Sequence, residues 1–153
     1  MNAINQVEYD DKIIQVKLLN VEKNSLFVAD IFKDISKNDV NIDMISEVML
    51  DDEMRIDFTC SQSDQDKLNK ALEDVKEDHP RIMVYQNRNV AKVKVQGEGM
   101  ANEVGVAANI FDILGKHQIP ILQITTSEIS ISCVIPNDFM NLAIKEIKEA
   151  YHL

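Results

Sequence analysis

The sequence contains an internal repeat that spans almost its whole length. Phe27–Phe32 aligns with Val106–Phe111, and the alignment extends in both directions, for example to Val16 opposite Val95. The first copy carries extra residues around positions 51 and 52, which we assign to a hairpin. Because such a repeat is one supersecondary unit used twice, the sequence predicts two small units with the same order of strands and helices.

Each copy shows the same succession of local patterns. Alternating polarity predicts strands, and apolar residues three or four positions apart predict one-sided helices. We expect the second helix of each copy to begin at Ser63 or Asn137, because both residue types cap helix N-termini well. The predicted strands are 12–19, 40–46 and 54–60 in the first copy and 91–96, 119–125 and 128–135 in the second, and the first helices cover 27–35 and 106–114.

The two copies differ in how their last strand is supplied. The first has a closing strand at 82–86, whereas the sequence stops soon after the final helix of the second. A further strand at 4–9 lies outside the first copy, and we expect it to close the second; a frayed N-terminal tail is the alternative. The sequence thus predicts an α+β fold of two ferredoxin-like (βαββαβ) units, the first inserted into the second. The expected boundaries are 12–88 for the first unit, and 1–11 with 89–153 for the second.

Charge and cysteine content narrow the possible partners. The formal net charge is -10 and the pI is about 4.7, so phosphate backbones and anionic lipid are poor partners. No apolar run approaches the roughly 20 residues of a membrane span. Cys60 and Cys133 lie in apolar strands, where we expect buried thiols; a disulfide or redox pair is the less favoured alternative. A cytoplasmic location follows from these features.

The sequence shows no catalytic constellation. His79, His117 and His152 have no metal-ligand spacing around them and are expected at the surface. The Gly97 turn resembles a dinucleotide-binding turn, but Asn102 stands where a third glycine is expected. We therefore predict no metal, no cofactor and no enzyme activity for this chain. Each copy does contain a turn that leads into a helix N-terminus, where free amides suit a carboxylate.

The most specific residues resemble the C-terminal regulatory region of aspartate kinases, which is built from paired ACT domains. The resemblance is carried in the second copy by Gly97-x-Gly-Met100, by Gly105–Phe111 and by Ile121–Ser132, and in the first copy by Val40–Ile45 and Ile56–Cys60. It implies the inserted arrangement already expected from the missing strand. It also implies feedback inhibition by lysine or threonine, bound where ACT domains of a homodimer meet, with a kinase domain or catalytic subunit as the partner that is inhibited.

The resemblance further implies an effector site made from both copies. The first copy would contribute Lys23, Asn24, Ser25, Leu26, Phe27, Val28, Ile42, Asp43 and Glu47. The second would contribute Met100, Asn102, Val104, Gly105, Val106, Gln118, Ile121, Ser127 and Glu128. Backbone amides at the two helix starts would hold the effector carboxylate, and an acid such as Asp43 or Glu128 would hold its ammonium group.

Two positions depart from the family pattern. Ser25-Leu26 stands where the family usually has Pro-Gly, and Pro120 stands where a polar Asn is common. The choice between lysine and threonine, and the number bound, stay open, as does whether the chain is a fragment or a separate subunit. Two other functions stay open: a stand-alone ACT-type sensor that controls another enzyme, and, less favoured, a small enzyme that binds phosphate at the Gly97 turn.

Overall fold

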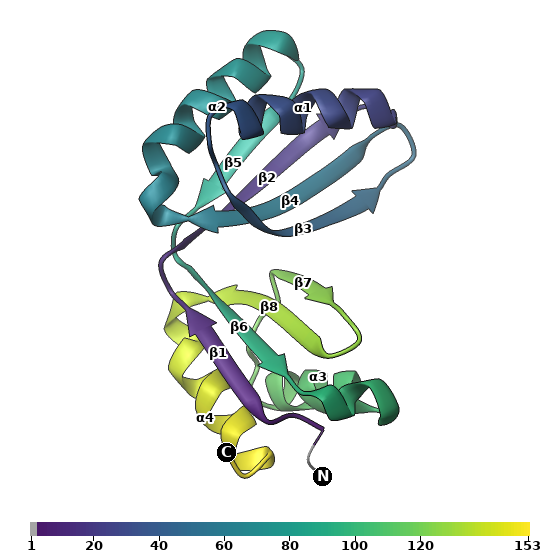
Figure 1. Cartoon of the computed structure of the whole chain (residues 1–153), viewed down its shortest axis with the longest axis vertical. Coiled ribbons are helices and arrows are strands. Elements are labelled where there is room, and N and C mark those ends of the chain that lie inside the picture. Colours follow the sequence, from purple (N-terminus) through teal and green to yellow (C-terminus); the bar gives the residue numbers. More distant parts are fainter. Residues whose placement is uncertain (1–2) are drawn as a thin grey trace. The chain divides into compact units, whose positions relative to one another are not determined.

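The computed structural model describes residues 3–153 and forms two compact units (Figure 1). One unit comprises residues 12–88, and the other comprises the N-terminal residues up to 11 together with 89–153. Each unit has one four-stranded antiparallel sheet and its own hydrophobic core. The predicted fold class, two ferredoxin-like units with the first inserted into the second, is confirmed.

The unit of residues 12–88 contains a sheet in the order β3-β4-β2-β5, with both long helices on one face (Figure 1). Apolar side chains of α1 and α2 pack on the inward side chains of β2 and β4, among which Phe58 is fully buried. The extra residues 50–53 form the predicted hairpin, closed by the Leu50 amide on the Glu53 carbonyl at 2.8 Å. Its elements are β2 (Ile13–Val21), α1 (Ser25–Lys37), β3 (Ile42–Met49), β4 (Met54–Ser61), η1 (Gln62–Asp64), α2 (Gln65–Asp78) and β5 (Met83–Asn87).

The other unit repeats this topology with the sheet order β1-β6-β8-β7. Its helices α3 and α4 pack on one core with the apolar side chains of β6 and β8. Its elements are β1 (Gln6–Asp10), β6 (Val90–Gln96), η2 (Glu98–Asn102), α3 (Val106–Lys116), β7 (Gln123–Thr126), β8 (Ser130–Pro136), η3 (Asn137–Phe139) and α4 (Met140–Ala150).

The N-terminal segment is integrated into this second unit. β1 pairs antiparallel with β6, and the Asn5 amide continues the ladder by donating to the Gln96 carbonyl at 3.0 Å. Ala3 and Ile4 are buried in the core. A Cβ atom on Gly97 would lie 1.8 Å from the Ala3 carbonyl oxygen, so only glycine permits this close approach of the two backbones.

Local details differ from prediction at three places. Ser63 and Asn137 do not cap the second helices, because a short 3-10 turn precedes each helix; instead Ser61 Oγ accepts from the Ser63 amide at 3.1 Å. The strand predicted at 119–125 is formed only from Gln123, because Pro120 has no amide to donate to a ladder.

Both cysteines are free and buried, as predicted. Burial raises the pKa of the Cys60 and Cys133 thiols to about 11. Neither thiol is therefore ionised near neutral pH. Within residues 3–153, no helix is both long and apolar enough to cross a bilayer.

We predict that Gly97→Ala lowers the free energy of unfolding by about 1–3 kcal/mol, because the new methyl group must displace the Ala3 backbone. Gly115→Ala is a matched control: its Cβ would meet nothing within 4 Å, and alanine is the better helix former by about 1 kcal/mol. Urea denaturation of both variants measures the difference. Equal stability of the two variants would contradict the packing of the N-terminal segment over Gly97.

Candidate functional site

The candidate site in the second unit lies where β6 leads into α3. Gln96 pairs with Ser130, and the Gly97 amide donates to the Ile129 carbonyl at 2.9 Å. The 97–105 segment and the β7–β8 hairpin therefore occupy the same end of the sheet. The structure brings together at this end seven of the residues predicted from the sequence: Met100, Asn102, Val104, Gly105, Val106, Ser127 and Glu128.

Gln118 and Ile121 lie away from this group in the same chain. Both follow the C-terminal end of α3, whose 11 residues span about 16 Å. The Leu122 amide then donates to the Val134 carbonyl at 2.8 Å, and Val134 pairs with Lys92 near the start of β6. One unit alone does not assemble the predicted second-copy site.

The N-terminus of α3 is open. Gly105 precedes it with a φ of 90°, a conformation that L side chains rarely adopt, and no side chain of residues 3–153 caps the first-turn amides. The first helical bond runs from the Asn109 amide to the Gly105 carbonyl at 3.0 Å. The amides before Asn109 thus point outward together with the positive end of the helix dipole, an arrangement suited to a carboxylate.

One residue of this corner was missed by the sequence analysis. The Glu103 Oε2 atom is buried and has no hydrogen-bond partner within residues 3–153. A buried carboxylate oxygen is costly to leave unpaired, so it is a candidate acceptor for an ammonium group. An acidic residue between Asn102 and Val104, both on the predicted list, was the only available signal.

At the corresponding corner of the first unit, the side chain of Asn24 caps the N-terminus of α1. Asn24 Oδ1 accepts from the Leu26 amide at 2.8 Å and from the Phe27 amide at 3.3 Å. The Val28 amide donates to the Asn24 carbonyl at 3.1 Å. A carboxylate at the predicted amides would have to displace the Asn24 side chain.

The other predicted first-copy residues are spread along edge strand β3. Val21, just before the α1 corner, pairs with Met54, and so does the last residue of β3, Met49. Ile42 pairs instead with Cys60, six residues further along β4, which is roughly 20 Å of strand. The α1 corner and the β3–β4 hairpin lie at the same end of the sheet, where Lys23 Nζ donates to the Asp51 carbonyl at 2.6 Å. Ile42 and Asp43 lie at the other end, with Glu47 between.

Of the three histidines expected at the surface, His79 is only partly exposed. Its side chain is only 15% exposed; Nε2 lies 2.7 Å from Asp30 Oδ2, and the ring packs on Phe27 with centroids 4.2 Å apart. The sequence placed His79 in a loop, but the tertiary fold brings that loop against α1. His117 and His152 are exposed, as predicted. Within residues 3–153 no group of three or more His, Cys, Asp or Glu could hold a metal ion.

The chain is similar to one protein family and to curated aspartokinases. Residues 93–151 match the ACT domain family. Aspartokinase 2 of Bacillus subtilis (strain 168) is 28% identical over 147 residues, which cover 96% of this chain and 36% of that protein. The chain thus spans about a third of the length of this curated relative.

Three solved structures share the fold. The crystal structure of aspartokinase alpha and beta subunits matches with a TM-score of 0.88 and 26% identity over 98% of this chain and 99% of that chain. The ligand-free regulatory subunit of aspartate kinase from Thermus thermophilus has a TM-score of 0.88 and 24% identity, over 97% and 99% of the two chains. E. coli aspartokinase III in complex with lysine and aspartate has a TM-score of 0.72 and 15% identity, over 97% and 33%.

These matches identify first the class, an ACT domain at residues 93–151 within a chain of ferredoxin-like fold. Within that class, the chain resembles the regulatory regions of aspartate kinases, as expected from the sequence.

We predict that Asn24→Ala lowers the free energy of unfolding by about 1 kcal/mol, because the side-chain cap of α1 is lost. Asn24→Ser should keep most of the stability, since serine caps nearly as well. Asn102→Ala is a matched control, because no side chain caps α3. Urea denaturation tests all three, and an unchanged Asn24→Ala variant would contradict the capping role.

Proposed function

We propose that the chain is the amino-acid-binding regulatory part of an aspartate kinase. It binds lysine or threonine and in doing so inhibits a kinase domain or catalytic subunit. The proposal is supported by the similarity to aspartokinases along nearly the whole chain and by the lysine held in the E. coli aspartokinase III structure of the same fold. We also propose that the two compact units are the two ACT domains and that the protein is cytoplasmic.

The observation that carries the proposal is the open N-terminus of α3 next to acidic side chains. The effector carboxylate would accept hydrogen bonds from the first-turn amides, which no side chain caps. Its ammonium group would be taken by the Glu103 carboxylate, one oxygen of which is buried without a partner within residues 3–153, or by Glu128 from the hairpin. A free amino acid has its ammonium and carboxylate groups attached to the same α-carbon. It therefore matches a site with backbone amides on one side and a carboxylate on the other.

A second copy of the chain would complete the site. β3 and β7 are edge strands. When two equal edge strands pair antiparallel, the start of one lies beside the end of the other. Such pairing would bring Ile42 and Asp43, or Gln118 and Ile121, to a helix corner of the partner copy. β3 suits burial because Ile45 and Met49 are 51% and 58% exposed. We therefore propose a homodimer.

The test is a titration of the purified chain with lysine and with threonine, read as a rise in the melting temperature. A ligand that binds only the folded form stabilises it by about 2.7 kcal/mol at one hundred times its Kd. We expect Glu103→Gln to weaken the shift, because the ammonium loses a charged acceptor, and Asp43→Ala to weaken a lysine-induced shift. Asp138→Asn, an exposed acid on η3, should change neither.

No shift with either amino acid, alone or together, would contradict the proposed function. A shift without any effect on the activity of an aspartate kinase partner would favour the stand-alone sensor instead.

A further inference from the structure

A second candidate site lies within the unit of residues 12–88. A cavity of about 320 Å³ opens at the end of the sheet where β2, the β3–β4 hairpin and the turn after α2 meet. This volume lies at the lower end of the range for small-molecule sites. Its lining residues are Asn20, Val21, Glu22, Phe27, Asp52, Glu53, Asp78, His79, Pro80 and Arg81.

One wall of the cavity is apolar and fixed in place. The Phe27 and His79 rings are in contact, and Asp30 holds the imidazole of His79. Asn20 Nδ2 donates to the Arg81 carbonyl at 3.1 Å, which ties the turn after α2 to the end of β2. Hydrogen bonds therefore join two of the segments that form the cavity, and an aromatic face is presented inside it.

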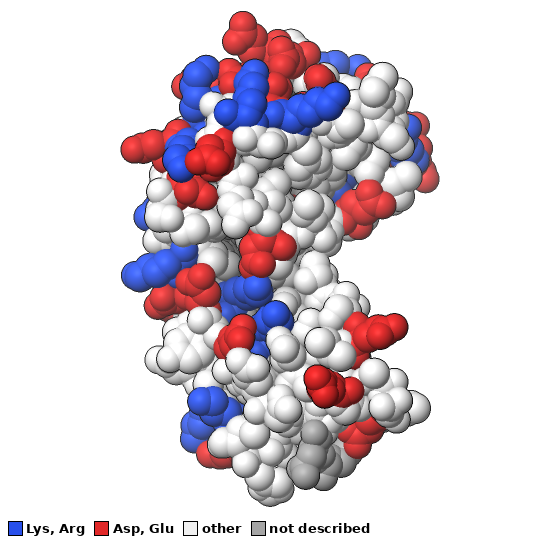
Figure 2. All heavy atoms as spheres, viewed as in Figure 1, with Lys and Arg blue, Asp and Glu red and all other residues white. Residues whose placement is uncertain are grey.

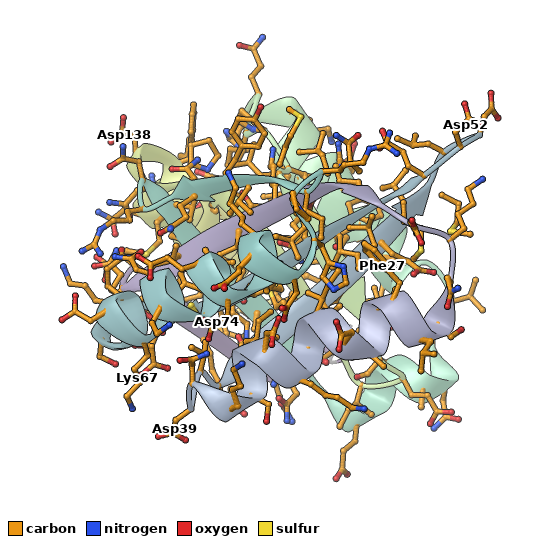
Figure 3. The ribbon with its side chains drawn as sticks, turned by 90° about the horizontal axis from the view of Figure 1, so that it is seen from above. Phe27, Asp39, Asp52, Lys67, Asp74 and Asp138 are labelled. Carbon is orange, nitrogen blue, oxygen red and sulfur yellow. The ribbon has the colours of Figure 1, made fainter. Side chains whose placement is uncertain are left out.

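The charge of the lining is mainly negative. Its lining residues include four acids, Glu22, Asp52, Glu53 and Asp78, and a single Lys or Arg residue, Arg81. Figure 3 shows Asp52 at the tip of the hairpin and Phe27 on α1, so the lining comes from elements far apart in sequence. An aromatic face beside carboxylates is a favourable environment for an organic cation.

Three of the cavity acids differ from Asp74, a paired acid on α2. Asp74 on α2 accepts hydrogen bonds from Lys70 and Asn38, which lower its pKa to about 2. Glu22, Asp52 and Glu53 have no ion-pair partner within the described part of the chain. These three carboxylates therefore form no direct ion pair within residues 3–153, although Arg81 also lines the cavity.

Asp78 also has an acidic neighbour outside the cavity, Asp34, which is ion-paired with Lys37 at 3.2 Å. Asp78 contacts the carboxyl group of Asp34 on α1, and the pKa of Asp34 is raised by burial and by that hydrogen bond. Two carboxylates in contact repel each other when both are ionised. A cation beside Asp78 would relieve this repulsion.

We propose that this cavity binds a small organic cation, an alkyl diamine or a related ammonium compound whose hydrocarbon part lies against Phe27. Because the acids line the cavity without clustering as metal ligands do within residues 3–153, an extended cation fits better than a metal ion. The site lies on the side of α1 that faces α2, whereas the proposed effector corner needs the β3 edge and α3. Phe27 is the one lining residue that the sequence analysis also placed in the effector site.

The test is isothermal titration of the full chain with 1,5-diaminopentane, with uncharged 1,5-pentanediol as the matched probe. We expect saturable binding of the diamine with a Kd below about 10 mM, weakened by added salt, and no binding of the diol. Glu22→Gln combined with Glu53→Gln should weaken diamine binding at least about tenfold. Both side chains lie at the cavity, outside the hydrophobic core, so the fold should persist, which an unchanged urea transition would verify.

Two control variants separate this proposal from the proposed function. Asp138→Asn removes one negative charge outside the cavity, and Glu103→Gln alters the proposed effector corner; neither should change diamine binding. The diamine has no carboxylate, so its binding does not depend on the α3 amides, and a failed lysine or threonine titration leaves this test intact. Absence of diamine binding, equal binding of the diol, or equal binding by the Glu22/Glu53 variant would overturn the proposal.

Discussion

The pairing of β1 with β6 is the interaction on which the architecture depends. It supplies the fourth strand of one sheet from the start of the chain, while the rest of that unit comes from residues after 88. Along the chain, the first unit is therefore inserted between two segments of the second. Gly97 allows this pairing to continue into the buried residues Ala3 and Ile4, because a larger residue would collide with the Ala3 carbonyl.

The two copies of the repeat have diverged at the corner where the first long helix begins. In the first copy, Asn24 satisfies the first-turn amides of α1 from within the chain. In the second, Gly105 leaves the amides of α3 uncapped, and Glu103 adds a buried carboxylate oxygen. With the same backbone topology, the first-turn amides of α1 are therefore bonded within the chain, whereas those of α3 are available to a ligand.

Charge is also distributed unevenly. Residues 12–88 hold 16 of the 26 acidic and 11 of the 16 basic residues, and Figure 2 shows both kinds interspersed over the helices of that unit. Three acids on its helices, Asp30, Asp34 and Asp74, form ion pairs with partly exposed basic side chains, and each such pair adds little stability. Within residues 3–153, Glu22 at the end of β2 and Asp52 and Glu53 in the hairpin form no such pairs, and the lining of the cavity there holds four acids against one arginine.

The sequence by itself determined the repeat, the order of elements and the inserted arrangement, because hydrophobic periodicity and the missing strand are properties of the chain. It also indicated the family and most of the residues at the α3 corner. It did not determine the caps before α2 and α4, the role of Asn24, the buried oxygen of Glu103 or the position of His79. Each of these features depends on which groups come into contact in the folded chain. Such contacts form between segments that lie far apart in the sequence, and the sequence separation of two segments does not give their distance in space.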